Sequence, residues 1–298
     1  MSDVKIGIIG GSGLGQALCE QTDGREVAVA TPFGEPSGPL IETQLGTFPV
    51  AVLNRHGAGH LIGPSRVNYR ANIFALKQVG CTHVIASGAV GSLRQELAPR
   101  DLVVPDQAID KTYRREGTFF GEDLAVHTEL ASPFCPVLRE HLLACQESVE
   151  TPVHDGGTYV CMEGPAFSTR AESEMHRAWG GDLIGMTVMP EAKLAREAEM
   201  SYALVALATD YDCWRPHDPG LTREALLGEI IGHLQAATQN ALSLIRAAIE
   251  AFAAKPLPLS ALHTGLDLAV WTERSKLTPE VTGRYGVLLE RYLTAKPR

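Results

Sequence analysis

The chain has 298 residues, of which 45% are hydrophobic and 20% charged, so it is long enough for one large or two ordinary folded domains and too apolar to be disordered. Its formal net charge of −9 at pH 7 argues against a broad nucleic-acid-binding surface, which would need an excess of basic residues. Because no apolar run approaches the roughly 18 residues that span a bilayer, and the N-terminus lacks a signal-peptide pattern, we expect a cytoplasmic protein that does not insert into membranes.

Short apolar segments that predict β-strands occur along the first two thirds of the chain. Most of them are almost wholly apolar, which is typical of strands in a sheet covered by helices on both faces. The predicted strands are Val4–Ile9, Pro49–Leu53, His83–Ala86, Leu102–Val104, Thr158–Met162, Leu183–Met186 and Tyr202–Ala208.

Segments with helical periodicity alternate with these strands. Residues 65–79 predict a helix that Ser65 caps and Gly80 ends. A second helix is predicted to begin near Thr169, because Thr169 and Glu172 have the spacing of a capping box.

The C-terminal third is predicted to be helical. Pro190 and Glu191 suit the first turn of a helix, and apolar residues recur at helical spacing from Thr222 to Ala254, which predicts one long helix packed on the sheet. A Pro-Leu-Pro segment ends that helix. Since strands and helices interleave without a repeat or polar linker, we expect one α/β domain over residues 1–298. Its mixed, mostly parallel sheet is flanked by helices, with a helical tail from about residue 256.

The six cysteines are scattered and form no CxxC pair. None lies near a histidine at zinc-finger spacing, so the pattern predicts reduced, buried thiols, with neither a metal site nor a disulfide framework. They are Cys19, Cys81, Cys135, Cys145, Cys161 and Cys213.

A glycine-rich turn, Gly10-Gly-Ser-Gly-Leu-Gly15, follows the first predicted strand. Its spacing fits neither the dinucleotide fingerprint nor the P-loop, and it does not form a nucleophile elbow around Ser12. The remaining interpretation is a loop whose backbone N–H groups and Ser12 hydroxyl hold a small anion.

Two further strand ends carry residues suited to an anion. Arg55 and His56 follow the strand at Pro49–Leu53 and supply a guanidinium fork and a second donor. The small residues of Ser87-Gly-Ala-Val-Gly-Ser92 follow another strand and expose backbone amides. The alternatives are a surface arginine with a packed histidine in the first case, and a tight turn that needs glycine in the second.

Two carboxylates, Asp210 and Asp212, follow the last predicted strand. Residues i and i+2 of an extended segment point to the same side, so both can address one ligand, and two close carboxylates tend to keep one protonated as a donor. The alternative is a solvated acidic turn. Taken together, the strand ends outline a phosphate on one side and a hydrogen-bonding group such as a nucleobase on the other.

These loops belong to a longer series of ordered motifs. The series is Gly7-Ile-Ile-Gly-Gly-Ser-Gly-Leu14, Thr31-Pro-Phe-Gly34, Arg55-His-Gly57, Val67-Asn-Tyr-Arg-Ala-Asn72, Gly91-Ser-Leu93, Met162-Glu-Gly-Pro165, Ser168-Thr-Arg-Ala-Glu172, Met186-Thr187, Pro190-Glu191 and Ala208-Thr-Asp-Tyr-Asp-Cys-Trp214. Over most of residues 4–220, and more loosely over 263–293, the chain resembles the 5′-methylthioadenosine phosphorylase family, the adenine-preferring branch of the trimeric purine nucleoside phosphorylases.

The resemblance implies a phosphorylase that transfers a pentosyl group in purine and methionine salvage. Inorganic phosphate, a co-substrate, attacks C1′ of 5′-methylthioadenosine and gives adenine and 5-methylthioribose 1-phosphate, with no metal or organic cofactor. The resemblance also implies a homotrimer. The implied phosphate site consists of Ser12, Arg55, His56, Ser87, Gly88, the backbone of Ala89, and Thr187.

The resemblance also places the nucleoside. Asp210 and Asp212 would read N7 and the 6-amino group, with protonated Asp210 as general acid and His56 as the second catalytic residue. A 6-oxopurine would set its carbonyl against the Asp212 carboxylate. The other implied contacts are Phe167 on the purine, Ser168 at its edge, Met186 against the ribose, Leu226 and Leu227 near the 5′ substituent, and His127 from a neighbouring subunit over the 5′ end.

Three positions depart from the family pattern. Gly88 stands where animal members carry threonine, so a hydroxyl contact to phosphate is lost or moves to Ser87. Ala166 replaces a common arginine, and Arg223 replaces a small apolar residue near the 5′ substituent. These departures leave the reaction class intact and leave the preference for methylthio over hydroxyl at C5′ open.

Three alternatives to this function differ in what they require of the chain. A purine nucleoside phosphorylase for adenosine, or for a 6-oxopurine nucleoside such as inosine or methylthioinosine, shares the fold, although an Asn at position 210 would suit the 6-oxopurine better. A hydrolase that uses water needs no anion site such as Arg55 and His56 provide. A non-catalytic nucleotide-binding module would need the third glycine of the dinucleotide fingerprint.

Overall fold

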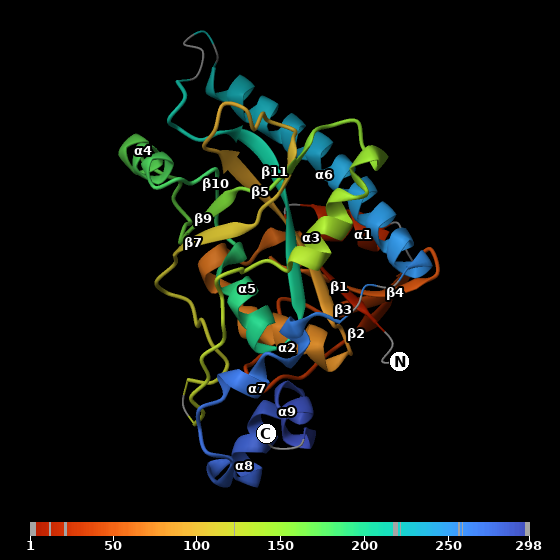
Figure 1. Cartoon of the computed structure of the whole chain (residues 1–298). Helices are drawn as coiled ribbons and strands as arrows, with labels where there is room; N and C mark the ends of the chain where they lie inside the picture. Colours follow the sequence, from red (N-terminus) through yellow and green to blue (C-terminus); the bar gives the residue numbers. More distant parts are fainter. Residues whose placement is uncertain are drawn as a thin grey trace.

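The structure is a computed structural model that describes residues 4–11, 13–20, 23–121, 123–216, 220, 222–255, 257 and 259–295, apart from the side chains at positions 16, 19, 20 and 223. Within these residues one eleven-stranded sheet forms the centre of the molecule (Figure 1). Its strands are β1 (Ile6–Gly10), β2 (Arg25–Val27), β3 (Leu40–Leu45), β4 (Phe48–Asn54), β5 (His83–Ser92), β6 (Leu102–Val104), β7 (Gln107–Lys111), β8 (Val153–Asp155), β9 (Thr158–Met162), β10 (Leu183–Gly185) and β11 (Ser201–Tyr211).

The sheet divides at β5, its central strand. One path runs β2-β3-β4-β1-β5-β10-β9-β7, while β11 pairs with the other edge of β5 and continues to β6 and β8. Six of the pairings are parallel and four antiparallel, which confirms the predicted mixed, mostly parallel sheet.

Helices cover both faces of this sheet (Figure 1). The described α-helices are α1 (Leu14–Glu20), α2 (Tyr69–Gln78), α3 (Pro136–Leu143), α4 (Arg170–Ala178), α5 (Val188–Glu197), α6 (Arg223–Ala254), α7 (Leu266–Ala269), α8 (Pro279–Tyr285) and α9 (Glu290–Thr294). The last three gather beyond one end of the sheet, where the C-terminus also lies (Figure 1).

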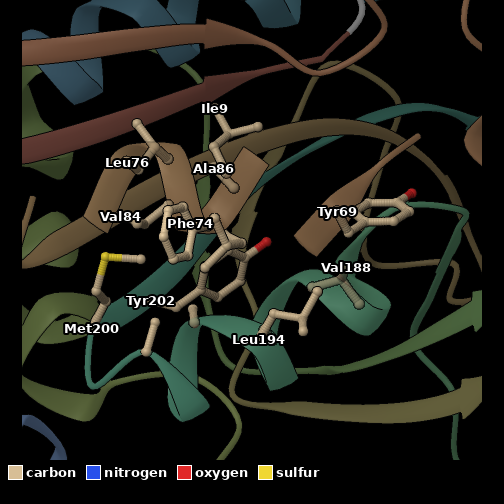
Figure 2. Packing of buried hydrophobic residues seen from close by; sticks show 14 of the residues in the cluster. Ile9, Tyr69, Phe74, Leu76, Val84, Ala86, Val188, Leu194, Met200 and Tyr202 are labelled. Carbon is tan, nitrogen blue, oxygen red and sulfur yellow. The ribbon is translucent and has the colours of Figure 1, made fainter. Parts of the chain in front are cut away.

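Two apolar cores lie on opposite faces of the sheet. Along β11, Tyr202 packs into the core with α2 and α5, which Figure 2 shows, and Leu204 belongs to the same core. Ala203 and Val205 pack into the core with α1, α3 and α6. Because alternate residues of an extended strand point to opposite faces, a strand between two cores must be apolar throughout. This requirement explains why the buried strands could be predicted from unbroken apolar runs.

The predicted strands are confirmed, with differences in length that matter for the site. The bounds of β6 and β9 are those predicted, whereas β5 and β11 are longer, so that the small residues 87–92 lie inside β5 and not in a turn after it. The alternative of a tight turn at these residues is therefore excluded. Strands β2, β3, β7 and β8 were not predicted, because most of their residues are exposed or half-buried and they contain polar side chains.

The predicted start of the first helix is also wrong. Helix α2 begins at Tyr69, and the capping side chain is Asn68, which accepts from the amide of Ala71 at 3.1 Å. Ser65 lies in a preceding 3-10 turn and donates to the carbonyl oxygen of Glu163 at 3.0 Å. The capping box of Thr169 and Glu172 at the start of α4 is confirmed.

The long C-terminal helix is confirmed as α6, capped by Thr222. Its first turns do not pack on the sheet as predicted, because Leu227 is 58% and Ile231 45% exposed. The buried stretch begins further along, at Ala237, and includes Ile245 and Phe252. The described part of the chain contains no helix long and apolar enough to cross a membrane.

The cysteines of the described side chains are free thiols. Cys81, Cys135 and Cys161 are buried, as predicted, while Cys145 and Cys213 are half-buried. Burial raises the pKa of the Cys81 and Cys161 thiols to about 12, so both stay protonated at neutral pH. Cys19 lies outside the described side chains.

A buried histidine makes the fold sensitive to acid. His83 begins β5, is 1% exposed and packs edge-on against Phe252 at 5.5 Å between ring centroids. Burial lowers the pKa of His83 to about 3, and the neighbouring His263 and His141 lower it further in the same direction. The imidazole is therefore neutral in the folded protein under conditions that protonate it in the unfolded chain.

We expect the free energy of unfolding to fall as the pH drops from 6.5 towards 3, because the unfolded chain then binds a proton that folded His83 cannot bind. Between about pH 7.5 and pH 5 the loss due to His83 is about 2 kcal/mol. Urea unfolding of the wild-type protein and of His83→Gln at the two pH values measures this contribution. An equal pH dependence in the two proteins would contradict it.

Candidate active site

A cavity of about 470 Å³ opens where several strands end on one side of the sheet. Residues that follow β1, β4, β10 and β11 line it, together with the second half of β5. Ligands of α/β sheets collect at the carboxyl ends of parallel strands, and this cavity occupies such a position. The residues that line the cavity include Gly11, Arg55, His56, Gly88, Ala89, Gly91, Phe167, Ser168, Met186, Thr187, Asp210, Asp212, Ile230 and Leu234.

The unpaired stretch of β5 creates the floor of this cavity. On one edge, β5 pairs with β1 through residues 83–86 and with β10 only from Gly91 onward, so residues 87–90 have no strand beside them there. A Cβ on Gly88 would lie 3.3 Å from the Thr187 hydroxyl oxygen, and one on Gly11 would lie 2.8 Å from Arg55 Nη1. The two glycines thus let the Thr187 and Arg55 side chains lie close to the backbone, and residues 87–90 are strand and not turn.

Arg55 is anchored by a buried carboxylate. Its side chain is fully buried, and its Nε and Nη2 donate to the two oxygens of Glu191 at 2.7 and 2.8 Å, while Nη1 donates to the Ser87 carbonyl oxygen at 2.8 Å. Glu191 Oε1 also accepts from the Tyr202 hydroxyl at 2.7 Å. Burial alone would lower the pKa of Arg55, but the charge of Glu191 outweighs it and holds that pKa above its usual value.

Two of the five guanidinium N–H groups remain available to a ligand. This geometry excludes the alternative of a surface arginine. Thr187 lies near by as the residue before α5, and its hydroxyl does not cap that helix. Gly11, Arg55, Gly88, Ala89 and Thr187 together form the donor end of the cavity. Ser12 lies outside the described residues.

His56 differs from its expected role as a second donor. Burial lowers the pKa of His56 to about 4, with the charges of Arg55 and His60 acting in the same direction. Its Nδ1 lies 2.7 Å from the carbonyl oxygen of Ile62, so Nδ1 carries the one ring proton. The other nitrogen, Nε2, is therefore an acceptor.

The two carboxylates at the end of β11 line the same cavity and form its acid end. An extra residue at Thr209 interrupts the register with β5, and a bulge of this kind re-aims the side chains that follow it. Asp210 Oδ1 accepts from the Thr209 hydroxyl at 2.8 Å. Asp212 is largely buried, and its Oδ2 has no hydrogen-bond partner among the described residues.

The donor end and the acid end are separated by a known length of strand. Gly88 contacts Thr187, and Gly91 contacts Asp212, whose Cβ would lie 3.3 Å from a Cβ on Gly91. Three residues of extended strand span about 10 Å. The cavity therefore suits an elongated ligand with an anion at one end and a donor group at the other.

Some residues implied by the family resemblance lie elsewhere. Leu226 and Leu227 do not line the cavity, because α6 turns Ile230 and Leu234 towards it. Phe167 lies at the rim and is 84% exposed, while Ser168 and Met186 line the wall. The side chain of Arg223 lies outside the described residues.

His127 does not line the cavity of its own chain. Its backbone amide donates to the Ala269 carbonyl oxygen at 2.9 Å, and its ring packs edge-on against the exposed Trp271 at 5.7 Å between centroids. It therefore lies beside α7, on the surface of the molecule.

Two residues, Arg115 and Glu191, shape this site although neither was among the predicted site residues. Arg115 is buried, and its Nη1 donates to the carbonyl oxygens of Met186 and Met189 at 2.6 and 2.7 Å, while its Nη2 donates to that of Glu163 at 2.7 Å. It thereby fixes the wall at Met186. Arg115 has no local sequence signal, since its partners lie 46 to 74 residues away, and the pairing of Glu191 with Arg55 spans 136 residues.

The arrangement offers N–H and O–H donors at one end and carboxylates at the other. Among the described residues no group of three or more His, Cys, Asp or Glu side chains is placed to hold a metal ion. The lining residues can supply hydrogen bonds, charge and proton transfer.

Known proteins are similar to this chain in sequence and in fold. Residues 5–250 match the model of the phosphorylase superfamily. The S-methyl-5′-thioadenosine phosphorylase of Thermosynechococcus vestitus is 45% identical over 292 residues, 97% of this chain and 99% of that one. A crystal structure of a methylthioadenosine phosphorylase from an Antarctic soil metagenomic library is 42% identical with a TM-score of 0.88, covering 97% of this chain and 100% of that one.

A third similar protein carries a ligand. It is a variant of the adenosine/methylthioadenosine phosphorylase of Schistosoma mansoni in complex with methylthioadenosine. That structure is 38% identical with a TM-score of 0.77, covering 85% of this chain and 93% of the other.

Proposed function

The chain belongs to the phosphorylase superfamily, and from this premise we propose that it is an S-methyl-5′-thioadenosine phosphorylase. It transfers the pentosyl group of 5′-methylthioadenosine to inorganic phosphate and releases adenine. The observation that carries this proposal is the single cavity with a donor end near Gly88 and a carboxylate pair near Gly91, about 10 Å apart along β5.

Phosphate is the co-substrate at the donor end. The two free N–H groups of Arg55, the backbone at Ala89 and the Thr187 hydroxyl supply its donors, and we include Ser12 from the family motif. Cleavage of a glycosidic bond passes through a cationic sugar, so a bound anion beneath C1′ both attacks it and balances its charge. Because Glu191 neutralises Arg55 in the free protein, the phosphate is held mainly by oriented hydrogen bonds.

The base lies at the acid end. Protonated Asp210 donates to N7 as the adenine leaves, which makes it the general acid. Asp212 Oδ2, buried and without a partner among the described residues, accepts from the 6-amino group. A ligand donor there satisfies an acceptor whose burial would otherwise be costly. Phe167 covers the purine and Ser168 lines its edge.

The sugar occupies the stretch between the two ends. Met186 lies against the ribose, and Arg115 holds it there through the Met186 carbonyl oxygen. Ile230 and Leu234 form an apolar wall, in place of Leu226 and Leu227, against which a 5′-methylthio group is better accommodated than a hydroxyl. Arg115 is a positioning residue, since it contacts the wall and not the substrate.

We extend the proposal to the assembly and the cell. One domain over the whole chain functions in the cytoplasm as a homotrimer, without a metal or organic cofactor, and His127 of one subunit covers the 5′ end of the nucleoside in another. The exposed Trp271 and Leu268 beside His127 support burial of that surface between subunits. A monomeric mass in sedimentation equilibrium would contradict this assembly.

A substrate series tests the proposed specificity. With saturating phosphate, kcat/KM for 5′-methylthioadenosine should exceed that for inosine and methylthioinosine by at least 100-fold, because their 6-oxo group leaves Asp212 unpaired and opposed to a carbonyl oxygen. The advantage over adenosine should be smaller, since the 5′ wall supplies only an apolar contact. Comparable rates for inosine would instead favour a 6-oxopurine nucleoside phosphorylase.

A further inference from the structure

A buried histidine of helix α4 lies beside the segment that carries the acid end. The guanidinium of Arg177, on this helix, lies over the Trp214 ring, 3.8 Å from its centroid, so α4 packs against the chain that follows Asp212. His176, the preceding helix residue, is 1% exposed. It does not line the cavity, and its imidazole is therefore buried behind the wall rather than open to a ligand.

Lys111, the last residue of β7, fixes the proton on this ring. Its Nζ lies 2.8 Å from His176 Nε2, and the same ammonium lies over the Trp179 ring, 5.3 Å from the centroid. An ammonium group only donates, so Nε2 accepts and the one ring proton is on Nδ1. Burial lowers the pKa of His176, and the Lys111 charge lowers it further, so the ring is neutral at neutral pH.

The ring lies between Lys111 and one carboxylate of the acid end. Strands β5, β10, β9 and β7 are consecutive in the sheet; Lys111 ends β7, whereas Asp212 packs against Gly91 of β5. The Asp212 charge acts on His176 and raises its pKa, although two strands separate β5 from β7. Because Lys111 occupies the Nε2 side of the ring, the Nδ1–H group is on the side of Asp212.

Two buried polar atoms here have complementary needs. Nδ1 of His176 is a donor and Oδ2 of Asp212 an acceptor, and neither has a hydrogen-bond partner among the described residues. An N–H dipole stabilises a carboxylate over several ångströms where the interior screens weakly. Of the other groups near by, Glu172 acts on the ring from the exposed start of α4, and the Cys213 thiol, whose pKa burial raises, adjoins Asp212.

We propose that Lys111 and His176 keep Asp212 ionised and thereby decide which carboxylate of the acid end carries the proton. That proton then resides on Asp210, the residue that has to donate it. The inference rests on the proposed function, because it takes a purine as the ligand of the acid end. Two close carboxylates tend to share one proton, and a donor behind only one of them makes the pair unequal. Both are positioning residues, since they act through Asp212.

The charge of Asp212 in turn selects the base. An ionised Asp212 accepts from the 6-amino group of adenine, whereas the 6-oxo group of hypoxanthine needs a proton on that carboxylate. Hypoxanthine therefore binds together with an extra proton, and its affinity falls as Asp212 becomes harder to protonate. Lys111 and His176 raise this cost for hypoxanthine from outside the cavity.

Calorimetric titration of the free protein with adenine and hypoxanthine tests the proposal without any turnover. At neutral pH we expect the dissociation constant of hypoxanthine to be at least about 100-fold that of adenine. Between about pH 6 and pH 8 this ratio should rise with pH, by up to about tenfold per pH unit, because only the hypoxanthine complex holds the extra proton. A ratio that does not change with pH would overturn the proposal.

Substitutions connect this ratio to the pair of residues. His176→Phe keeps an aromatic ring without the N–H group, and Lys111→Met keeps the stem without the charge. Each should lower the ratio about tenfold, the equivalent of one pKa unit on Asp212. Lys111→Arg keeps a charged donor and should stay within about threefold of the wild-type ratio. Lys193→Met removes the lysine that pairs with Asp110, next to Lys111 in sequence, and should leave the ratio unchanged.

The ratio separates this role from a structural one, which would weaken the binding of both bases alike. Wild-type ratios in His176→Phe and Lys111→Met, with thermal midpoints that show both variants to be folded, would contradict the proposal. If His176→Phe does not fold, equal ratios in Lys111→Met and Lys111→Arg contradict it instead. The proposed function fails separately, since the expected ratios without any phosphorolysis would contradict the reaction and not the role of His176.

Discussion

Replacing Asp210 with asparagine is expected to lower kcat for the phosphorolysis of 5′-methylthioadenosine by at least about 100-fold, because proton transfer by a positioned side chain contributes roughly 10²- to 10⁴-fold to a rate. The amide keeps the shape of the carboxyl group and can still hydrogen-bond to N7, but it cannot transfer a proton. Asp210 lies in the cavity at the end of β11, with its Oδ1 held by the Thr209 hydroxyl. Steady-state kinetics at saturating phosphate measure the loss.

Two matched substitutions separate this role from a general effect of charge. Asp155→Asn removes an exposed carboxylate on β8 and should leave kcat unchanged. Asp212→Asn turns an amide towards the 6-position, so it should chiefly reduce the preference for adenine over 6-oxopurine nucleosides. If Asp210→Asn has the kcat of the wild-type protein while its thermal midpoint is also unchanged, Asp210 is not the general acid.

Replacing Glu191 with glutamine is expected to lower the free energy of unfolding by about 3–5 kcal/mol, because it leaves the buried Arg55 without a counter-charge. Both side chains are fully buried, and the two guanidinium–carboxylate bonds are 2.7 and 2.8 Å long. Glutamine has the same size, so no cavity contributes to the loss. Urea unfolding at a fixed protein concentration measures it.

An ion pair with an exposed carboxylate provides the control. Glu129 pairs with Arg196 at 2.9 Å, but the Glu129 side chain is 66% exposed, and Glu129→Gln should cost less than about 1 kcal/mol. Replacing both Arg55 and Glu191 with methionine should recover part of the stability and abolish phosphate binding, since it removes the unpaired charge together with the donors. Glu191→Gln with no greater loss than Glu129→Gln would show that the buried pair is not a main stabilising element.

The buried strands are predictable from sequence because a strand that is buried on both faces of the sheet is apolar throughout. Strands β6 and β9 have the predicted bounds. The capping box of Thr169 and Glu172 was predictable because both residues lie within one helical turn of each other in the sequence. Strand β3, the second strand from one end of the sheet, lacks this apolar pattern, because its four middle residues are not buried and three of them are polar. The helix start at Asn68 was missed because Ser65, three residues earlier, is an equally good cap on sequence grounds.

Site residues could be predicted where they lie close together in the sequence, and not where their placement depends on residues far away in the sequence. Asp210 and Asp212 share a cavity because the chain places them on one strand end. By contrast, the position of the ring proton on His56 depends on its loop folding back to Ile62, and the fixed position of Arg55 depends on Glu191, 136 residues away. The continuation of β5 through residues 87–90 with one edge open could not be predicted, because a gap between two neighbouring strands leaves no sequence signal.

The most direct test of this account is the dependence of base release on phosphate. Purified protein incubated with 5′-methylthioadenosine should release adenine only when phosphate is present, with one equivalent of 5-methylthioribose 1-phosphate formed for each adenine. Both products can be quantified in one chromatographic run. Adenine release that continues undiminished in phosphate-free buffer, with free 5-methylthioribose as the sugar product, would show that water is the nucleophile and would contradict the assignment of the donor end to phosphate.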